Sequence, residues 1–269
     1  MKLNYLRSKR EYIMRIIKIR SVIAVIVMLL VNVTNFSYAA ANEKTNEKSK
    51  RIIAGFIKQQ AKSNVSIGRS ISTILSRYPE QVDAIVPIAL ELYPDKYKQI
   101  IIGAINAESA LACDVVEAAI NSNIVESDEI VRIAIEADPA YANEIIETAA
   151  TNDIEEIQNI IRVGITIEGT NGKDVMKSAL ASFPEQLVGI LSGAIQALPN
   201  QVTEFVASAI NLFPSKAEQV VTTAVSQNTN IGNREIVNKA IANGVSETAA
   251  IDAAIAGGAN QQELIVKDQ

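Results

Sequence analysis

Two adjacent lines of sequence, PEQLVGILSGAIQAL (184–198) and PNQVTEFVASAINLF (199–213), match position by position, so that Pro184 aligns with Pro199. Proline opens both lines, and paired aliphatic or aromatic residues follow at the same distances, as Ile190-Leu191 stands over Phe205-Val206. A third copy begins at Pro214. A repeat of this length decides the architecture before any single residue does. We number the 15 positions of each unit as columns, counted from the proline.

The register extends from residue 64 almost to the end of the chain, with one residue gained near 228–231 and one lost near 243. Columns 7, 8 and 12 are apolar, and column 11 is alanine or glycine in every unit from 79 to 228. Apolar residues in columns 4, 7, 8, 11, 12 and 15 are spaced by three and four, which is typical of one face of an α-helix. We expect the small residue in column 11 to let helix backbones approach each other.

Proline in column 1 suits the first turn of a helix, because its missing N–H needs no partner there. Each unit therefore predicts one helix and a short turn, and two consecutive units predict an antiparallel hairpin. The fold class expected is all-α, an α-solenoid of about 13 short helices. Two irregularities interrupt it: Pro87 falls in column 9, where it should kink or shorten its helix, and the glycine-rich turn at 167–173 suggests a bend.

This pattern resembles the general α-solenoid class that includes tetratricopeptide and HEAT repeats, across about residues 64–266. Two features differ from the tetratricopeptide pattern. The repeat has a different length, whether one unit or two are counted, and the chain has no tryptophan. The resemblance is to an architecture and implies no functional residue.

Residues 1–39 have a different composition. A basic leader precedes an apolar run from Val22 to Val31, and Ser37-Tyr38-Ala39 has the small-x-small pattern of a signal-peptidase site. We therefore expect 1–39 to be a cleaved signal peptide, with Met14 as an alternative start, and the protein to be exported to the periplasm or beyond. The other interpretation is an uncleaved membrane anchor. Residues 40–49 are expected to be a flexible lead-in, and 50–269 a single helical repeat domain.

Loss of 1–39 would remove seven basic residues and one acid, which leaves 18 basic and 29 acidic residues and a net charge near −11. That balance disfavours nucleic acid as a partner. Basic residues concentrate in 44–77 and acids in 126–156. This asymmetry could steer a partner, join copies head to tail, or simply keep the chain soluble.

The usual catalytic residue types are missing. The chain has no histidine, which removes His-based catalysis and the commonest zinc ligand. Gly172-Lys173 lacks the upstream glycine of a phosphate-binding loop, and pairs such as Asp128-Glu129 lack the frame of a calcium loop. The single cysteine, Cys113, reads as a packed small residue or as a site for pairing between chains. No catalytic, metal, cofactor or small-molecule site is expected.

Taken in every second unit from the one that starts at 109, column 6 carries an acid, at Asp114, Glu144, Asp174 and Glu204. Residues two units apart belong to equivalent helices of successive hairpins, so we expect these four, the acidic ladder, to follow one face with a spacing on the order of 10 Å. Such a row suits an extended basic partner. The alternative is that column 6 is an ordinary exposed position.

The function expected is that of an exported bacterial, non-catalytic protein-binding or scaffold module. One alternative is a self-associating structural or surface protein that stacks through its terminal repeats. The other is a hydrolase that uses carboxylates alone, which would need two acids in one cleft.

Overall fold

The computed structural model describes residues 48–60, 65–167, 169–228 and 230–265. The predicted signal peptide and most of the predicted lead-in lie outside the described residues. The chain divides into two compact units, Met1–Ile53 and Ala54–Gln269. The helical repeat belongs to the second unit.

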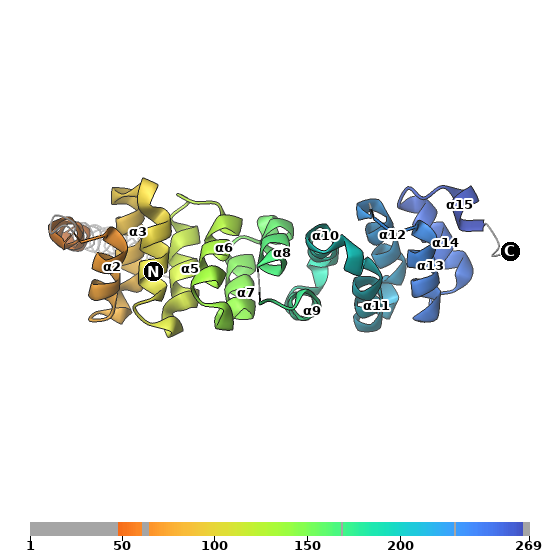
Figure 1. Cartoon of the computed structure of the whole chain (residues 1–269), viewed down its shortest axis with the longest axis horizontal. Helices are drawn as coiled ribbons and strands as arrows, with labels where there is room; N and C mark the ends of the chain where they lie inside the picture. The colour runs from red at the N-terminus through yellow and green to blue at the C-terminus, as the bar shows by residue number, and fades with distance from the viewer. Residues whose placement is uncertain (1–47, 61–64, 168, 229, 266–269) are drawn as a thin grey trace, which may run out of the picture. The chain divides into compact units, whose positions relative to one another are not determined.

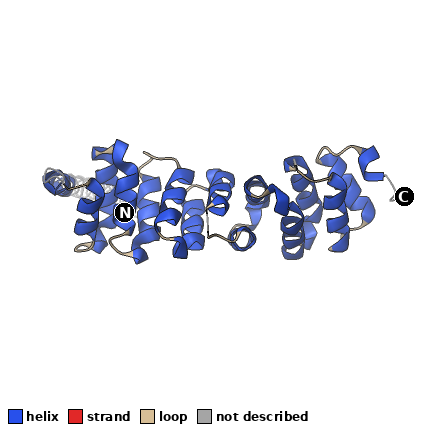
Figure 2. Cartoon of the chain, viewed as in Figure 1, coloured by secondary structure: helices blue, strands red, loops and turns tan. Residues whose placement is uncertain are grey.

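The described residues fold into α-helices and short 3₁₀ turns, without a strand among them (Figure 2). This confirms the all-α fold class. A helix covers residues 48–60, and fourteen labelled helices follow. They are α2 (Ile67–Leu75), α3 (Val82–Leu92), α4 (Tyr97–Ile105), α5 (Ala112–Asn121), α6 (Ser127–Ala137), α7 (Ala142–Asn152), α8 (Ile157–Thr166), α9 (Gly172–Ser182), α10 (Leu187–Ala197), α11 (Val202–Leu212), α12 (Ala217–Gln227), α13 (Asn233–Ala242), α14 (Glu247–Ala256) and α15 (Gln261–Ile265).

The register of the repeat is confirmed by the helix starts. Every α-helix from α3 at Val82 to α12 at Ala217 begins in column 4, one full unit after the helix before it. The step to α13 is one residue longer and the step to α14 one shorter, as the inserted and missing residues predict.

Columns 1 to 3 form a separate 3₁₀ turn in most units. In six of the eight turns the first residue is proline, whereas Ser109 and Ile154 open the other two. The turns are η1 (Pro79–Gln81), η2 (Pro94–Lys96), η3 (Ser109–Leu111), η4 (Pro139–Tyr141), η5 (Ile154–Glu156), η6 (Pro184–Gln186), η7 (Pro199–Gln201) and η8 (Pro214–Lys216).

Each helix packs against its neighbours in the chain and against the helix two places on. The even-numbered helices from α2 to α14 contact one another in series, and the odd-numbered helices from α3 to α15 do the same. Figure 1 shows the helices following one another in chain order. The core therefore runs between the even and odd series.

Burial follows the predicted stripe closely. Columns 7, 8, 11 and 12 are buried in all ten units from 79 to 228, from Ile85 and Val86 to Ala224 and Val225. Column 15 is the exception, because its described residues are half-buried or exposed. Tyr93, Phe183 and Phe213 occupy it just after a helix has ended, where the chain turns away from the core.

The two irregularities behave differently from each other. Helix α3 holds Pro87 in its interior and is as long as α7 or α11, so Pro87 does not shorten it. No 3₁₀ turn is found among the described residues between α8 and α9, and Gly169 has φ +95°. Helices α7 and α8 still contact α9 and α10 across this turn, and the predicted bend there stays a prediction.

Two close helix crossings are built on glycines in column 10. A Cβ added at Gly103 in α4 would lie 2.7 Å from the Cα of Gly68 in α2, and one added at Gly193 in α10 would lie 3.2 Å from the backbone nitrogen of Arg162 in α8. At Gly164, in column 11, the added atom would meet the side chain of Ile146 instead. At these two crossings backbone meets backbone at column 10, and the role of the small column-11 residues stays a prediction.

We expect Gly103→Ala to destabilise the protein by about 1–3 kcal/mol, because the new methyl group overpacks the contact between α2 and α4. Gly55→Ala is the matched control, since an added Cβ there has no neighbour within 4 Å and alanine is the better helix former. Urea unfolding followed by circular dichroism measures both. Equal midpoints for the two variants would contradict the close crossing.

Candidate functional site

The acidic ladder lies on one series of helices. Asp114, Glu144, Asp174 and Glu204 are each the third residue of their helix, on α5, α7, α9 and α11, and all four are exposed. These helices contact one another in order. The four acids therefore occupy equivalent exposed positions on successive packed helices of the odd series.

One further acid continues the ladder. Glu235 is the third residue of α13, is exposed, and belongs to the helix that packs on α11. Counting two regular units from Glu204 misses it, because the residue gained near 228–231 shifts the register by one. In the even series the same column holds mostly uncharged residues, with Gln99, Asn159 and Gln219 among them.

The ladder acids have no partner within the part of the chain that the structure describes. Neither the four predicted residues nor Glu235 takes part in an ion pair or a side-chain hydrogen bond there. Glu117 and Glu147 lie three residues further along α5 and α7 and are also exposed, so two of the helices present two acids each.

Two acids of the even series, both at the start of α6, have cationic partners, unlike the ladder acids. On α6, Glu129 forms ion pairs of 3.0 Å with both Lys98 of α4 and Arg132 of its own helix. Asp128 lies 3.5 Å from Arg162 of α8. These contacts join three successive even helices through opposite charges.

The pKa of Glu129 reflects this setting. Partial burial alone would raise it, but the hydrogen bonds and positive charges of Lys98 and Arg132 outweigh burial and lower the pKa. The pKa of the Lys98 ammonium is raised, chiefly by its hydrogen bond to Glu129 and by the charge of that carboxylate.

Several other acids of 126–156 also have internal partners. Ser127, which is buried, donates a hydrogen bond of 2.6 Å to Asp153, and Ser182 donates one of 3.0 Å to Glu147. Part of the acidic middle is therefore already engaged within the chain. Its pairing with the basic stretch 44–77 of another copy stays a prediction.

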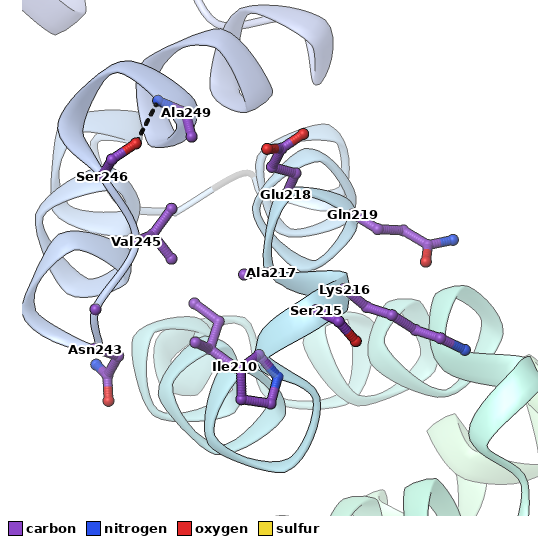
Figure 3. A pocket seen from close by; sticks show the side chains of 12 residues that line it. Ile210, Ser215, Lys216, Ala217, Glu218, Gln219, Asn243, Val245, Ser246 and Ala249 are labelled. Atoms are coloured by element: carbon purple, nitrogen blue, oxygen red, sulfur yellow. Dashed lines mark hydrogen bonds between the residues drawn. The ribbon is translucent and has the colours of Figure 1, made fainter.

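A hollow of about 550 Å³ lies between the start of α12 and the turn that leads into α14 (Figure 3). Ile210, Ala217 and Val245 face one another across it, whereas Lys216 extends away from it. Lys216 instead donates to the carbonyl oxygen of Pro184 at 3.0 Å and pairs with Glu185 at 3.2 Å. In this way η8 lies against η6, two turns earlier.

The hollow arises because the next turn of that kind is missing. Residues 243–246 enter α14 directly from Ser246, with Gly244 at φ +95° and no 3₁₀ turn. A second hollow of about 300 Å³ adjoins residues 121–127, where the 3₁₀ turn before α6 is also missing. It holds two acids, Glu126 and Asp153, and no aromatic side chain.

Metal-ligating and membrane-spanning features are absent from the described residues. They contain no group of three His, Cys, Asp or Glu residues that could hold a metal ion. No helix among them is both long enough and apolar enough to cross a bilayer. Cys113 is a half-buried free thiol on α5, next to Asp114 of the ladder.

We expect Glu129→Gln to lower the free energy of unfolding by about 0.5–1 kcal/mol at neutral pH, since it breaks two ion pairs. The folded-state pKa of Glu129 is depressed, so its stabilisation is present above the ordinary value of 4.5 and is lost as the pH falls through the lower folded value. The gap between wild type and variant should therefore close in acid. Glu136→Gln, at an exposed acid of the same helix, is the control. A gap that is constant from pH 7 to about pH 3 would contradict this assignment.

No protein-family model, curated protein or solved structure matches this chain. Its function therefore has to be inferred from its own residues and their arrangement.

Proposed function

We propose that this chain is an exported bacterial α-solenoid that binds another protein, or serves as a scaffold for one, without catalysing a reaction. The observation that carries the proposal is the row of exposed, unpaired carboxylates on α5, α7, α9, α11 and α13. The partner that fits it is a protein segment rich in lysine and arginine.

The solenoid interpretation is supported by the contact pattern. Each helix touches its neighbours one and two places away in the chain, which is how helical repeat arrays are built. Arrays of this kind present extended surfaces on which equivalent residues recur along the stack. A surface of that shape suits a long partner better than a small molecule.

A local role in helix stability does not explain the acids of the ladder well. Acids in the first turn of a helix interact favourably with its dipole, and that benefit is the same for even and odd helices. Yet the even series places Gln99, Asn159 and Gln219 in the same column. The one even-series acid there, Glu129, has two cationic partners, unlike any member of the ladder. The difference between the series favours a role outside the helix itself.

Export rests on the leader sequence. A basic start, an apolar run too short to span a bilayer and a small-x-small site ending at Ala39 together favour cleavage and release.

The carboxylate-only hydrolase receives little support. The hollow that holds both Glu126 and Asp153 has no aromatic lining, and Asp153 already accepts a hydrogen bond from Ser127.

The ladder is tested with a variant in which all five acids become amides: Asp114→Asn, Glu144→Gln, Asp174→Asn, Glu204→Gln and Glu235→Gln. The probe is a fluorescent peptide made mostly of lysine and long enough to span several helices, and the measurement is its anisotropy at low and at physiological salt. We expect the amide variant to bind at least about tenfold more weakly, because five favourable charge contacts are lost.

The control changes the same number of exposed acids outside the ladder and so has the same net charge: Glu80→Gln, Glu91→Gln, Glu108→Gln, Glu155→Gln and Glu218→Gln. Equal loss in both variants would mean that only overall charge matters, and the ladder proposal would then fail.

The export proposal predicts that the protein recovered from outside the cytoplasm of a bacterial host begins at Ala40. Intact mass spectrometry measures this start directly. Replacement of Ala39 by Leu should block processing and leave the leader attached, because the cleavage site needs a small residue. Recovery of the chain in the cytoplasm with an intact leader would contradict export.

A further inference from the structure

The residue that ends a unit, in column 15, can reach the start of the neighbouring helix. A Cβ added at Gly172 would lie only 2.8 Å from Cδ1 of Leu198. Asp153 accepts a hydrogen bond of 2.6 Å from Ser127. Each pair joins column 15 of one unit to column 4 of the unit before it. In these units the column-15 side chain therefore fills the space over the first residue of a helix.

An aromatic residue takes part in such a contact in the unit before α12. The ring of Phe213, in column 15, lies 5.8 Å from Nζ of Lys216. The same Nζ is 3.0 Å from the carbonyl oxygen of Pro184 and 3.2 Å from the carboxylate of Glu185. The segment FPSK (213–216) thus places a ring, a proline and a cation between the starts of two successive even-numbered helices.

The equivalent segment before α14 lacks these side chains. Helix α14 begins two full units after α12, so Asn243 and Gly244 stand in the places of Phe213 and its proline. The side chain of Asn243 donates a hydrogen bond of 2.7 Å to a carbonyl oxygen of its own helix and accepts one of 3.2 Å from Asn211. It is therefore held away from Ala217, which occupies column 4, and the hollow of about 550 Å³ lies over Ala217.

The lining of this hollow combines an apolar floor with one acid. Ile210, Ala217 and Val245 form the floor (Figure 3). Glu218 lies at the rim, is exposed and has no ion pair among the described residues. Lys216 extends away from the hollow and is paired elsewhere, so it does not neutralise this carboxylate. The lining therefore complements a large apolar side chain with a cation near it.

We propose that the hollow binds an aromatic–proline segment of another protein, with a lysine or arginine two residues after the proline. The aromatic ring lies on Ala217 and the cation pairs with Glu218. In this chain the two segments of that pattern, YPDK (93–96) and FPSK (213–216), hold their aromatic residues half-buried in their own units, which favours a different protein as the partner over a second copy. None of the ladder acids lines the hollow, so the inference stands apart from the ladder.

The probe is a fluorescent peptide with the sequence NLFPSKAE, which is that of residues 211–218. It carries one lysine and one glutamate, so its overall charge contributes little to binding. The measurement is its anisotropy with the purified full chain. We expect this peptide to bind at least about tenfold more tightly than the same peptide with Phe213→Ala, because the ring becomes buried. Equal affinities of the two peptides would overturn the proposal.

A variant that fills the hollow tests its location. Ala249 is half-buried and lines the hollow, so we expect Ala249→Leu to weaken binding of the peptide about tenfold. Ala207→Leu is the matched control, because Ala207 is also half-buried but lies on α11 outside the lining. Thermal unfolding followed by circular dichroism checks that both variants fold. A folded Ala249→Leu protein with wild-type affinity would place the peptide elsewhere and overturn the proposal.

The role of the acid at the rim is tested separately. Glu218→Gln should weaken binding about threefold and reduce its dependence on salt, whereas Glu91→Gln, at an exposed acid of α3, should bind the peptide like the wild type. Equal effects of the two variants would contradict the pairing of the cation with Glu218. The ladder amide variant should still bind this peptide, so failure of the ladder proposal leaves this result unaffected. Peptide affinity that falls as the protein concentration rises would show that a second copy fills the hollow, and would overturn the choice of partner.

Discussion

The structure depends on the burial of one narrow stripe by helices that are too short to persist alone. Most of the helices span ten or eleven residues, and isolated helices of that length are marginal in water. Each one is stabilised by placing columns 7, 8, 11 and 12 against helices one and two places away. Stability is thus shared between neighbours along the chain, and the small residues of columns 10 and 11 matter because they set how closely those neighbours approach.

Because the helices pack in this way, the core and the surface of the protein repeat with different periods in the sequence. The core repeats with every unit, since every helix buries the same columns whichever series it belongs to. The surface repeats with every second unit, since side chains of helix n meet those of helix n+2. Lys98 contacts Glu129, Lys216 contacts Glu185 and Gln196 contacts Gln227, each pair separated by two units and one further position. Selection on the surface can therefore act on one series of helices without disturbing the other, while selection on the core acts on both.

The core was predictable from the sequence because its period is short and its residue types are restricted. The spacing of the helix starts, the burial of columns 7, 8, 11 and 12 and both register shifts follow from alignment of the units alone, whereas the α-helices begin in column 4 and not at the proline of column 1, as the sequence had suggested. Contacts that depend on three-dimensional neighbours were not predictable in this way. The meeting of Gly68 with Gly103 joins different columns of units two apart, and Glu235 lies off the regular count. Column 15 was misjudged because its spacing continues the helical stripe, although the chain has already left the helix when it reaches Tyr93 or Phe213. The two hollows arise where a 3₁₀ turn does not form. The sequence between α5 and α6 does not predict that absence.

Within column 6, Glu129 of the even series has cationic partners and the acids of the odd series have none among the described residues, and this contrast favours a role of the surface beyond solubility. Solubility requires charge on both series and is indifferent to pairing. In the even series, however, Asp128, Glu129 and Glu185 lie beside Arg162, Lys98 and Lys216 of helices or turns two places away, so their charge is largely neutralised within the chain. In the odd series no such cation accompanies Asp114, Glu144 or Glu204 among the described residues. Each of these carboxylates interacts favourably with the dipole of its own helix, but unneutralised carboxylates in a row also repel one another, and this repulsion is a cost to the isolated chain. The cationic partner that we propose would offset this cost.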